Sequence, residues 1–134
     1  MQTNPPPLCT LLEEIAGWTL DRTAGDYAGS LDSMGWYASN TGSTTHPVGQ
    51  KQANAWGLAD MHGNIWEWCA DWYGNYPGGS VSDSPGAPSG AFRVYRGGCW
   101  VDTATICRSA ICERIEPGYR GTCLGFRLAL SSVP

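Results

Sequence analysis

The sequence predicts a single, loop-rich α+β domain. The chain has 134 residues, a length that suits one domain with one hydrophobic core. Its 18 glycines and 9 prolines demand frequent turns and leave space for only sparse regular structure. One stretch has a helical pattern of apolar residues and two have a strand pattern, so both kinds of element are expected.

The helical pattern lies in an N-terminal segment, residues 1–29. Leucine and isoleucine recur with helical spacing from Leu8 to Ile15, and Thr10 is a candidate N-cap. We therefore expect a helix in this segment, followed by the main domain at residues 30–134.

Strand patterns occur at residues 92–96 and 124–130, where apolar and polar side chains alternate. We expect these strands to belong to small antiparallel sheets. A second helix or an irregular turn is expected near Asn64. Residues 74–90 are dense in glycine, proline and serine and predict a surface loop.

Charge and composition argue against several classes of protein. The formal net charge of −4 disfavours a nucleic-acid-binding protein, which needs a basic face. No apolar run approaches the roughly 18 residues of a membrane-spanning helix. Residues 1–7 are polar and proline-rich and have no signal-peptide pattern, so a cytoplasmic location is the default expectation.

The six cysteines leave two interpretations open. An even number permits disulfides, but no secretory signal supports an oxidising compartment, and buried free thiols are the alternative. No Cys-x-x-Cys pair is present, which argues against a structural zinc site.

The densest aromatic stretch is residues 56–72, which holds four of the seven tryptophans. So many large side chains must build much of a small core. Carboxylates are interleaved with them, and a buried carboxylate needs a partner. These carboxylates therefore hold a metal, take part in catalysis or pair with a cation.

Six motifs follow one another along the chain: 46–49 (HPVG), 56–61 (WGLADM), 63–68 (GNIWEW), 93–100 (RVYRGGCW), 107–110 (CRSA) and 124–127 (LGFR). In this order they resemble the formylglycine-generating enzyme family, also called sulfatase-modifying factors. The resemblance implies a variant of the C-type lectin fold over roughly residues 30–130. The N-terminal half of the family has no clear counterpart, so we expect a shortened version of the fold.

The resemblance also bears on catalysis. The family uses two cysteines five positions apart, and these positions fall on Asp102 and Cys107. An aspartate is a hard oxygen ligand and cannot replace a thiolate at Cu(I), so no copper and no enzymatic activity are expected. The alternative is a divergent enzyme that pairs Cys107 with Cys112 or Cys99 in a shifted register.

In the family, the loop equivalent to residues 60–67 wraps a calcium ion. Carried over, the ligands would be the side chains of Asp60 and Glu67 and the backbone carbonyls of Gly63 and Ile65, an oxygen set suited to calcium. The alternative is that Glu67 pairs with an arginine such as Arg127, while Asp60 accepts backbone hydrogen bonds.

Between residues 99 and 123, scaffold-like residues are mixed with residues that follow no burial pattern. We call the latter the variable surface: Val101, Asp102, Thr103, Thr105, Ile106, Ile111, Cys112, Glu113, Ile115, Glu116, Gly118, Tyr119, Gly121, Thr122 and Cys123. The mixture resembles the ligand-binding variable proteins of diversity-generating retroelements, whose template adenines are copied with errors. Most of these residue types can arise from an asparagine codon in that way, but Glu113 and Glu116 cannot. The alternative is that the isoleucines are core residues of a short final sheet.

Together these observations predict a non-catalytic ligand-binding protein with a diversified surface on a C-type lectin scaffold. Its ligand would be a protein or another macromolecule, with an apolar patch rimmed by acidic residues as the contact surface. Two alternatives stay open: a sulfatase-modifying-factor-type enzyme that oxidises a substrate cysteine to formylglycine, and a structural fragment completed by a partner subunit. A homo-oligomer is compatible with each of them.

Overall fold

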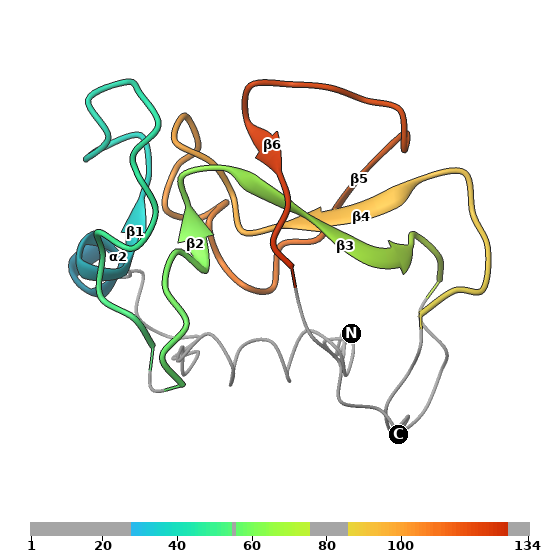
Figure 1. Cartoon of the computed structure of the whole chain (residues 1–134), viewed down its shortest axis with the longest axis horizontal. Helices are drawn as coiled ribbons and strands as arrows, with labels where there is room; N and C mark the ends of the chain where they lie inside the picture. Colours follow the sequence, from blue (N-terminus) through green and yellow to red (C-terminus); the bar gives the residue numbers. More distant parts are fainter. Residues whose placement is uncertain (1–27, 55, 76–85, 129–134) are drawn as a thin grey trace, which may run out of the picture.

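The computed structural model describes residues 28–54, 56–75 and 86–128 (Figure 1). The helix predicted between Leu8 and Ile15 lies outside these residues. Within the described residues, the regular structure consists of one helix, two very short paired strands and a four-stranded sheet, so the α+β, loop-rich class is confirmed. The described residues include no helix of the length and apolarity that crossing a membrane requires.

The four-stranded sheet carries the domain. Its strands are β3 (Trp66–Trp72), β4 (Arg93–Arg96), β5 (Glu113–Ile115) and β6 (Leu124–Gly125), arranged in the order β5-β4-β3-β6. Neighbours β3, β4 and β5 run antiparallel, as expected, but β6 runs parallel to β3. Parallel neighbours need a long crossover connection, and the chain between β3 and β6 supplies one.

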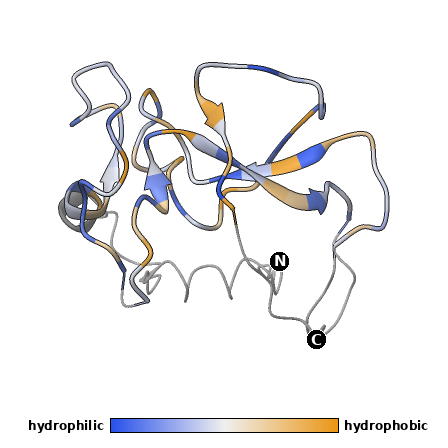
Figure 2. Ribbon diagram, viewed as in Figure 1, coloured by the Kyte–Doolittle hydropathy of each residue, from blue (hydrophilic) through white to orange (hydrophobic). Residues whose placement is uncertain are grey.

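Sequence patterns located two of these four strands, β4 and β6, and missed β3 and β5. The pattern at 92–96 corresponds to β4, where hydrophilic and hydrophobic residues alternate (Figure 2). The pattern at 124–130 begins with the two-residue β6. Of the helix or irregular turn expected near Asn64, the turn is confirmed: residues 64 and 65 form a bend in which Asn64 has φ +62°, and β3 follows in place of a helix. Aromatic packing stabilises β3, because Trp66 and Trp68 both pack edge-on against Tyr95 of β4, at centroid distances of 4.8 and 6.3 Å.

Helix α2 (Ala28–Met34) was not expected from its polar, glycine-containing surroundings. Its Leu31 is fully buried and forms a core cluster with Tyr37 and Cys107. The hydroxyl of Tyr37 donates to Asp32 Oδ1 at 2.7 Å, which fixes the helix against the strand that follows. Tertiary burial therefore stabilises a helix that local propensity does not predict.

Strands β1 (Gly35–Trp36) and β2 (His62–Gly63) pair in parallel and bring the two backbones unusually close. Gly63 has φ +73°, and a Cβ placed on it would lie 1.9 Å from the carbonyl oxygen of Trp36. Only glycine fits this crossing, because a side chain would meet rigid backbone on the facing strand.

The next residue, Asn64, ties three segments together at this crossing. It is 6% exposed, and its side chain exchanges two hydrogen bonds with the backbone of His46, both 2.9 Å long. Its backbone N–H donates to Trp36 O at 2.7 Å, and its carbonyl accepts from Trp100 N at 3.0 Å. The described part of the fold is thus fastened where residues 36, 46, 64 and 100 meet.

We expect Gly63→Ala to lower the free energy of unfolding by about 3 kcal/mol or more, because the added methyl forces β1 and β2 apart. Gly42→Ala is the matched control. Gly42 also has a positive φ, +61°, but no atom lies within 4 Å of a Cβ placed there. The control should cost about 1–2 kcal/mol, from backbone strain alone. Urea unfolding followed by tryptophan fluorescence measures both, and equal losses would contradict the close approach.

Candidate functional site

The strand register places part of the variable surface on one face of the sheet. Glu113 pairs with Tyr95, and because side chains alternate along a strand, Ile115 lies on that same face. Arg114, which lies between them and is not one of the variable-surface residues, pairs with the buried Val94 on the opposite face. The alternation thus separates the two variable-surface residues of β5 from Arg114.

A cavity of about 240 Å³ lies on the Tyr95 face, between the sheet and the loops that follow β4 and β5. Its walls are Trp66, Tyr95, Cys99, Val101, Asp102, Ile115, Tyr119, Cys123 and Leu124. Five of these belong to the predicted variable surface. The other four were missed, although the alternation of β3 and β4 could have identified Trp66 and Tyr95 once the register was known.

The remaining ten variable-surface residues surround this cavity or lie further along the same loops. Seven are exposed, namely Thr103, Thr105, Glu113, Glu116, Gly118, Gly121 and Thr122, and three are half-buried, namely Ile106, Ile111 and Cys112. None of the fifteen is buried. The alternative was that the isoleucines are core residues. Ile106, Ile111 and Ile115 are each half-buried, so they are neither fully buried nor fully exposed.

Residues between the variable positions attach the loop to the core. Cys107 is fully buried, and its carbonyl lies 2.8 Å from His62 Nδ1. Arg96 Nη1 donates to the carbonyls of Ser109 and Ile111, at 3.0 and 3.3 Å. These contacts use backbone atoms of the loop, so they do not depend on which side chains the variable positions carry.

The two positions that carry catalytic cysteines in the resembled family have structural contacts here. Asp102 Oδ2 accepts a hydrogen bond from Cys99 N at 2.9 Å, closing a tight turn. Burial, and secondarily the charge of Asp102, raises the pKa of the Cys107 thiol to about 12. Burial also raises the pKa of the Cys99 thiol. Both thiols are therefore protonated near neutral pH, where a thiolate would be the reactive form.

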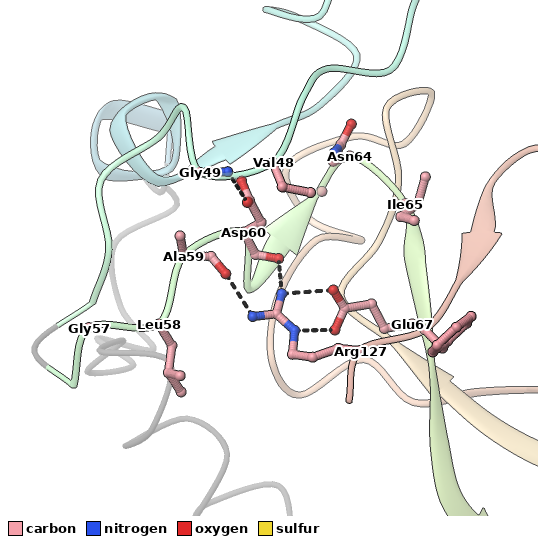
Figure 3. A pocket seen from close by; sticks show the side chains of 12 residues that line it. Val48, Gly49, Gly57, Leu58, Ala59, Asp60, Asn64, Ile65, Glu67 and Arg127 are labelled. Carbon is pink, nitrogen blue, oxygen red and sulfur yellow. Dashed lines mark hydrogen bonds and ion pairs between the residues drawn. The ribbon is translucent and has the colours of Figure 1, made fainter. Parts of the chain in front are cut away.

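The loop predicted to hold calcium is organised around an arginine (Figure 3). Arg127 Nε and Nη2 donate to the two carboxylate oxygens of Glu67, at 2.8 and 2.7 Å. The same guanidinium donates to the carbonyls of Ala59 and Asp60, at 2.8 and 2.9 Å. Asp60 Oδ2 accepts from Gly49 N at 2.6 Å. These are the contacts that the alternative to calcium required.

The donor set fits calcium poorly as it stands. Both oxygens of Glu67 and one oxygen of Asp60 already accept hydrogen bonds, and Asp60 Oδ1 is the one buried carboxylate oxygen here with no partner. The residues that the structure describes hold no group of three or more His, Cys, Asp or Glu able to bind a metal. Gly63 and Ile65 lie within the same loop, beside Asp60 and Glu67. Calcium binding stays a prediction.

A second, larger cavity of about 470 Å³ surrounds this ion pair. Apolar side chains in and near it are strongly exposed: Val48 is 81% exposed, and Phe126 is 71% exposed. Such exposure is what a fragment completed by a partner subunit would show. That interpretation also stays a prediction.

Comparison with known proteins identifies the domain. The family described as "Sulfatase-modifying factor enzyme 1-like domain" matches residues 15–132. The chain is 44% identical over 91 residues to serine/threonine-protein kinase pkn1 of Chlamydia caviae, covering 65% of this chain and 15% of the kinase. It is 34% identical over 96 residues to the formylglycine-generating enzyme of Streptomyces coelicolor, covering 64% of this chain and 29% of the enzyme. The chain thus spans less than a third of either relative.

Solved structures agree with this assignment. Treponema denticola variable protein 1 superposes with a TM-score of 0.74 at 39% identity, over 86% of this chain and 42% of that protein. PvdO from Pseudomonas aeruginosa superposes with a TM-score of 0.69 at 27% identity, over 88% of this chain and 49% of that protein. The expected C-type-lectin-type fold is confirmed. The chain belongs to the sulfatase-modifying factor enzyme 1-like domain family.

Proposed function

We propose that this domain binds a macromolecular ligand through the variable surface and is not an enzyme. The observation that carries the proposal is the separation of two residue classes within one segment. All fifteen variable-surface residues are exposed or half-buried, and five of them line the 240 Å³ cavity. The interleaved Cys107 is buried in the core, and Ala104 packs against it.

A surface built in this way can change its side chains without unfolding the domain. Loop positions at the surface tolerate substitution at little energetic cost, whereas buried positions do not. The similarity to a protein named variable protein 1 supports the same conclusion. It also supports the idea that a retroelement diversifies these positions.

The geometry around Asp102 and Cys107 supports the absence of catalysis. Copper-dependent oxidation of a cysteine needs thiolates that the metal and substrate can reach. One of the two positions is an aspartate, and the other is a fully buried thiol with a raised pKa. Cys99, the other buried candidate, is only 2% exposed.

We expect most variants randomised at the fifteen variable-surface positions to stay folded, because none of these side chains is buried. Protease resistance of a cell-surface-displayed library measures the folded fraction. A matched library randomised at Ala104, Cys107, Arg108, Ser109 and Ala110 is the control, and it should lose most of its folded members. Comparable losses in both libraries would contradict the proposal.

Sequencing the DNA around the gene then tests the origin of the diversity. A reverse transcriptase and a near-copy of the codons for residues 99–123 are expected, and their absence would remove the retroelement from the proposal while leaving ligand binding to be tested.

The buried thiols predict a loss of stability in alkali. Above the ordinary thiol pKa of 9.0, Cys107 loses its proton in the unfolded chain but keeps it in the folded one, up to about pH 12. The free energy of unfolding should therefore fall as pH rises from 9, by about 1.4 kcal/mol per pH unit for this thiol. Urea unfolding at pH 7.5–10.5 with a reductant measures this, and Cys107→Ala should show a shallower fall. Rapid alkylation of Cys107 in the native protein at pH 8 would contradict a buried, protonated thiol.

The enzyme alternative has its own test. Conversion of a cysteine-containing peptide to formylglycine by this protein would contradict the proposed absence of catalysis.

We infer that Arg127, rather than calcium, neutralises Glu67. The pair is bidentate and partly exposed, at 33% and 26% of the two side chains, so Arg127→Ala should cost about 1–2 kcal/mol. Arg127→Lys is the conservative control and should recover only part of this, because an ammonium cannot form the fork. Chelator-stripped wild type should unfold at the same urea concentration with and without calcium. A calcium-dependent rise in that midpoint, or heat of calcium binding in a titration, would establish the metal site instead.

A further inference from the structure

The 240 Å³ cavity combines an apolar, aromatic wall with one carboxylate. Trp66 and Tyr95, which meet edge-to-face, line it together with Ile115 and Tyr119. Aromatic faces attract cations, and apolar walls cover the alkyl stem of a long side chain. The wall is therefore suited to a guest with an apolar stem and a cationic head.

Asp102 is positioned to receive that head. Its backbone carbonyl accepts from Ala38 N at 2.9 Å, and its Oδ2 accepts from Cys99 N at 2.9 Å. Both contacts fix the orientation of the residue. Neither of these two contacts uses Oδ1, the second oxygen of the carboxylate.

No cation of the described chain occupies this position. Among the nine described residues that line the cavity, Asp102 is the one carboxylate, and there is no lysine or arginine. Neighbouring arginines are engaged elsewhere. Arg93 and Arg114 lie over aromatic rings, with the guanidinium carbon 3.7 and 4.2 Å from the ring centres. Arg96 and Arg120 donate to backbone carbonyls.

The acidic character extends around the cavity. Burial raises the pKa of the Tyr95 hydroxyl, and the carboxylates of Glu113 and Asp102 raise it further. Glu113 shares the sheet face of Tyr95, and Glu116, which is exposed, directly follows β5. A negative potential concentrated in a partly enclosed cavity attracts positively charged groups.

We propose that this cavity is a specificity pocket for an arginine or lysine side chain of a protein ligand, with Asp102 pairing the cationic head and Tyr95 and Tyr119 contacting its stem. The proposal rests on the proposed function and names the chemistry that the variable surface of this chain recognises. Because Asp102 is itself a variable-surface position, the preference belongs to this sequence and not to the family.

The test compares two probes of nearly equal shape, n-butylguanidinium and n-butylurea, by NMR titration of the whole chain. We expect the cation to bind at least about tenfold more tightly than the neutral urea, because only the cation can form a charge-assisted hydrogen bond with the Asp102 carboxylate. Added salt should weaken the binding of the cation but not that of the urea.

Two variants locate the charge that matters. Asp102→Asn should abolish the preference for the cation. Its amide oxygen can still accept the hydrogen bond from Cys99 N–H, so the fold is kept. Glu116→Gln is the matched control, because it removes one negative charge from the rim without altering a lining residue, and it should reduce the affinity less than threefold.

Equal binding of the two probes, tighter binding of n-butyrate, or a preference that survives Asp102→Asn would overturn the pocket. Selection of displayed peptides on the protein separates this from failure of the proposed function. Peptides that lack lysine and arginine but lose binding when variable-surface residues are replaced would overturn the pocket and leave ligand binding standing. Peptides that bind only outside the variable surface would overturn both.

Discussion

The close crossing at Gly63 and Asn64 is the constraint on which the described fold depends. Gly63 lets two backbones approach to a distance that no side chain allows, and Asn64 uses its backbone and side chain to join three distant segments. A buried amide that satisfies all its partners specifies one arrangement, since any shift leaves polar groups without hydrogen bonds. In a domain with a small core and short strands, these hydrogen bonds fix the relative positions of segments that long sheets would fix in a larger fold.

The tryptophan-rich stretch that follows this crossing contributes to the packing of the sheet. Trp66 and Trp68 pack against Tyr95, and Glu67, which lies between them in the sequence, forms an ion pair with Arg127. The carboxylate that sequence considerations left as a metal ligand, a catalyst or one half of an ion pair forms the ion pair. Oxidation of a substrate cysteine would require accessible thiols near positions 102 and 107. Cys99 and Cys107 are both buried.

Family motifs predicted the fold class and strand alternation predicted β4, because motif order and alternation are properties of sequence. Ligand binding by the variable surface stays a prediction. Three features were beyond such patterns. Helix α2 depends on the burial of Leu31 against Tyr37 and Cys107, which are remote in sequence or become neighbours only on folding. The parallel pairing of β3 with β6 depends on topology. The walls contributed by Trp66 and Tyr95 depend on register, which becomes known only once strands are paired.

Both ends of the variable segment are attached to the same short stretch of chain. Gly97 accepts a hydrogen bond from Gly63 N at 2.7 Å, and Cys123 accepts one from Trp66 N at 2.8 Å. The segment between them is therefore a closed loop whose two anchor points lie three residues apart. Since the entropy of closing a loop grows only slowly with its length, the exposed stretches of this loop that contact neither the core nor β4 can gain or lose residues at small cost while the anchors stay in register. Length as well as side-chain identity is therefore a means of reshaping the surface.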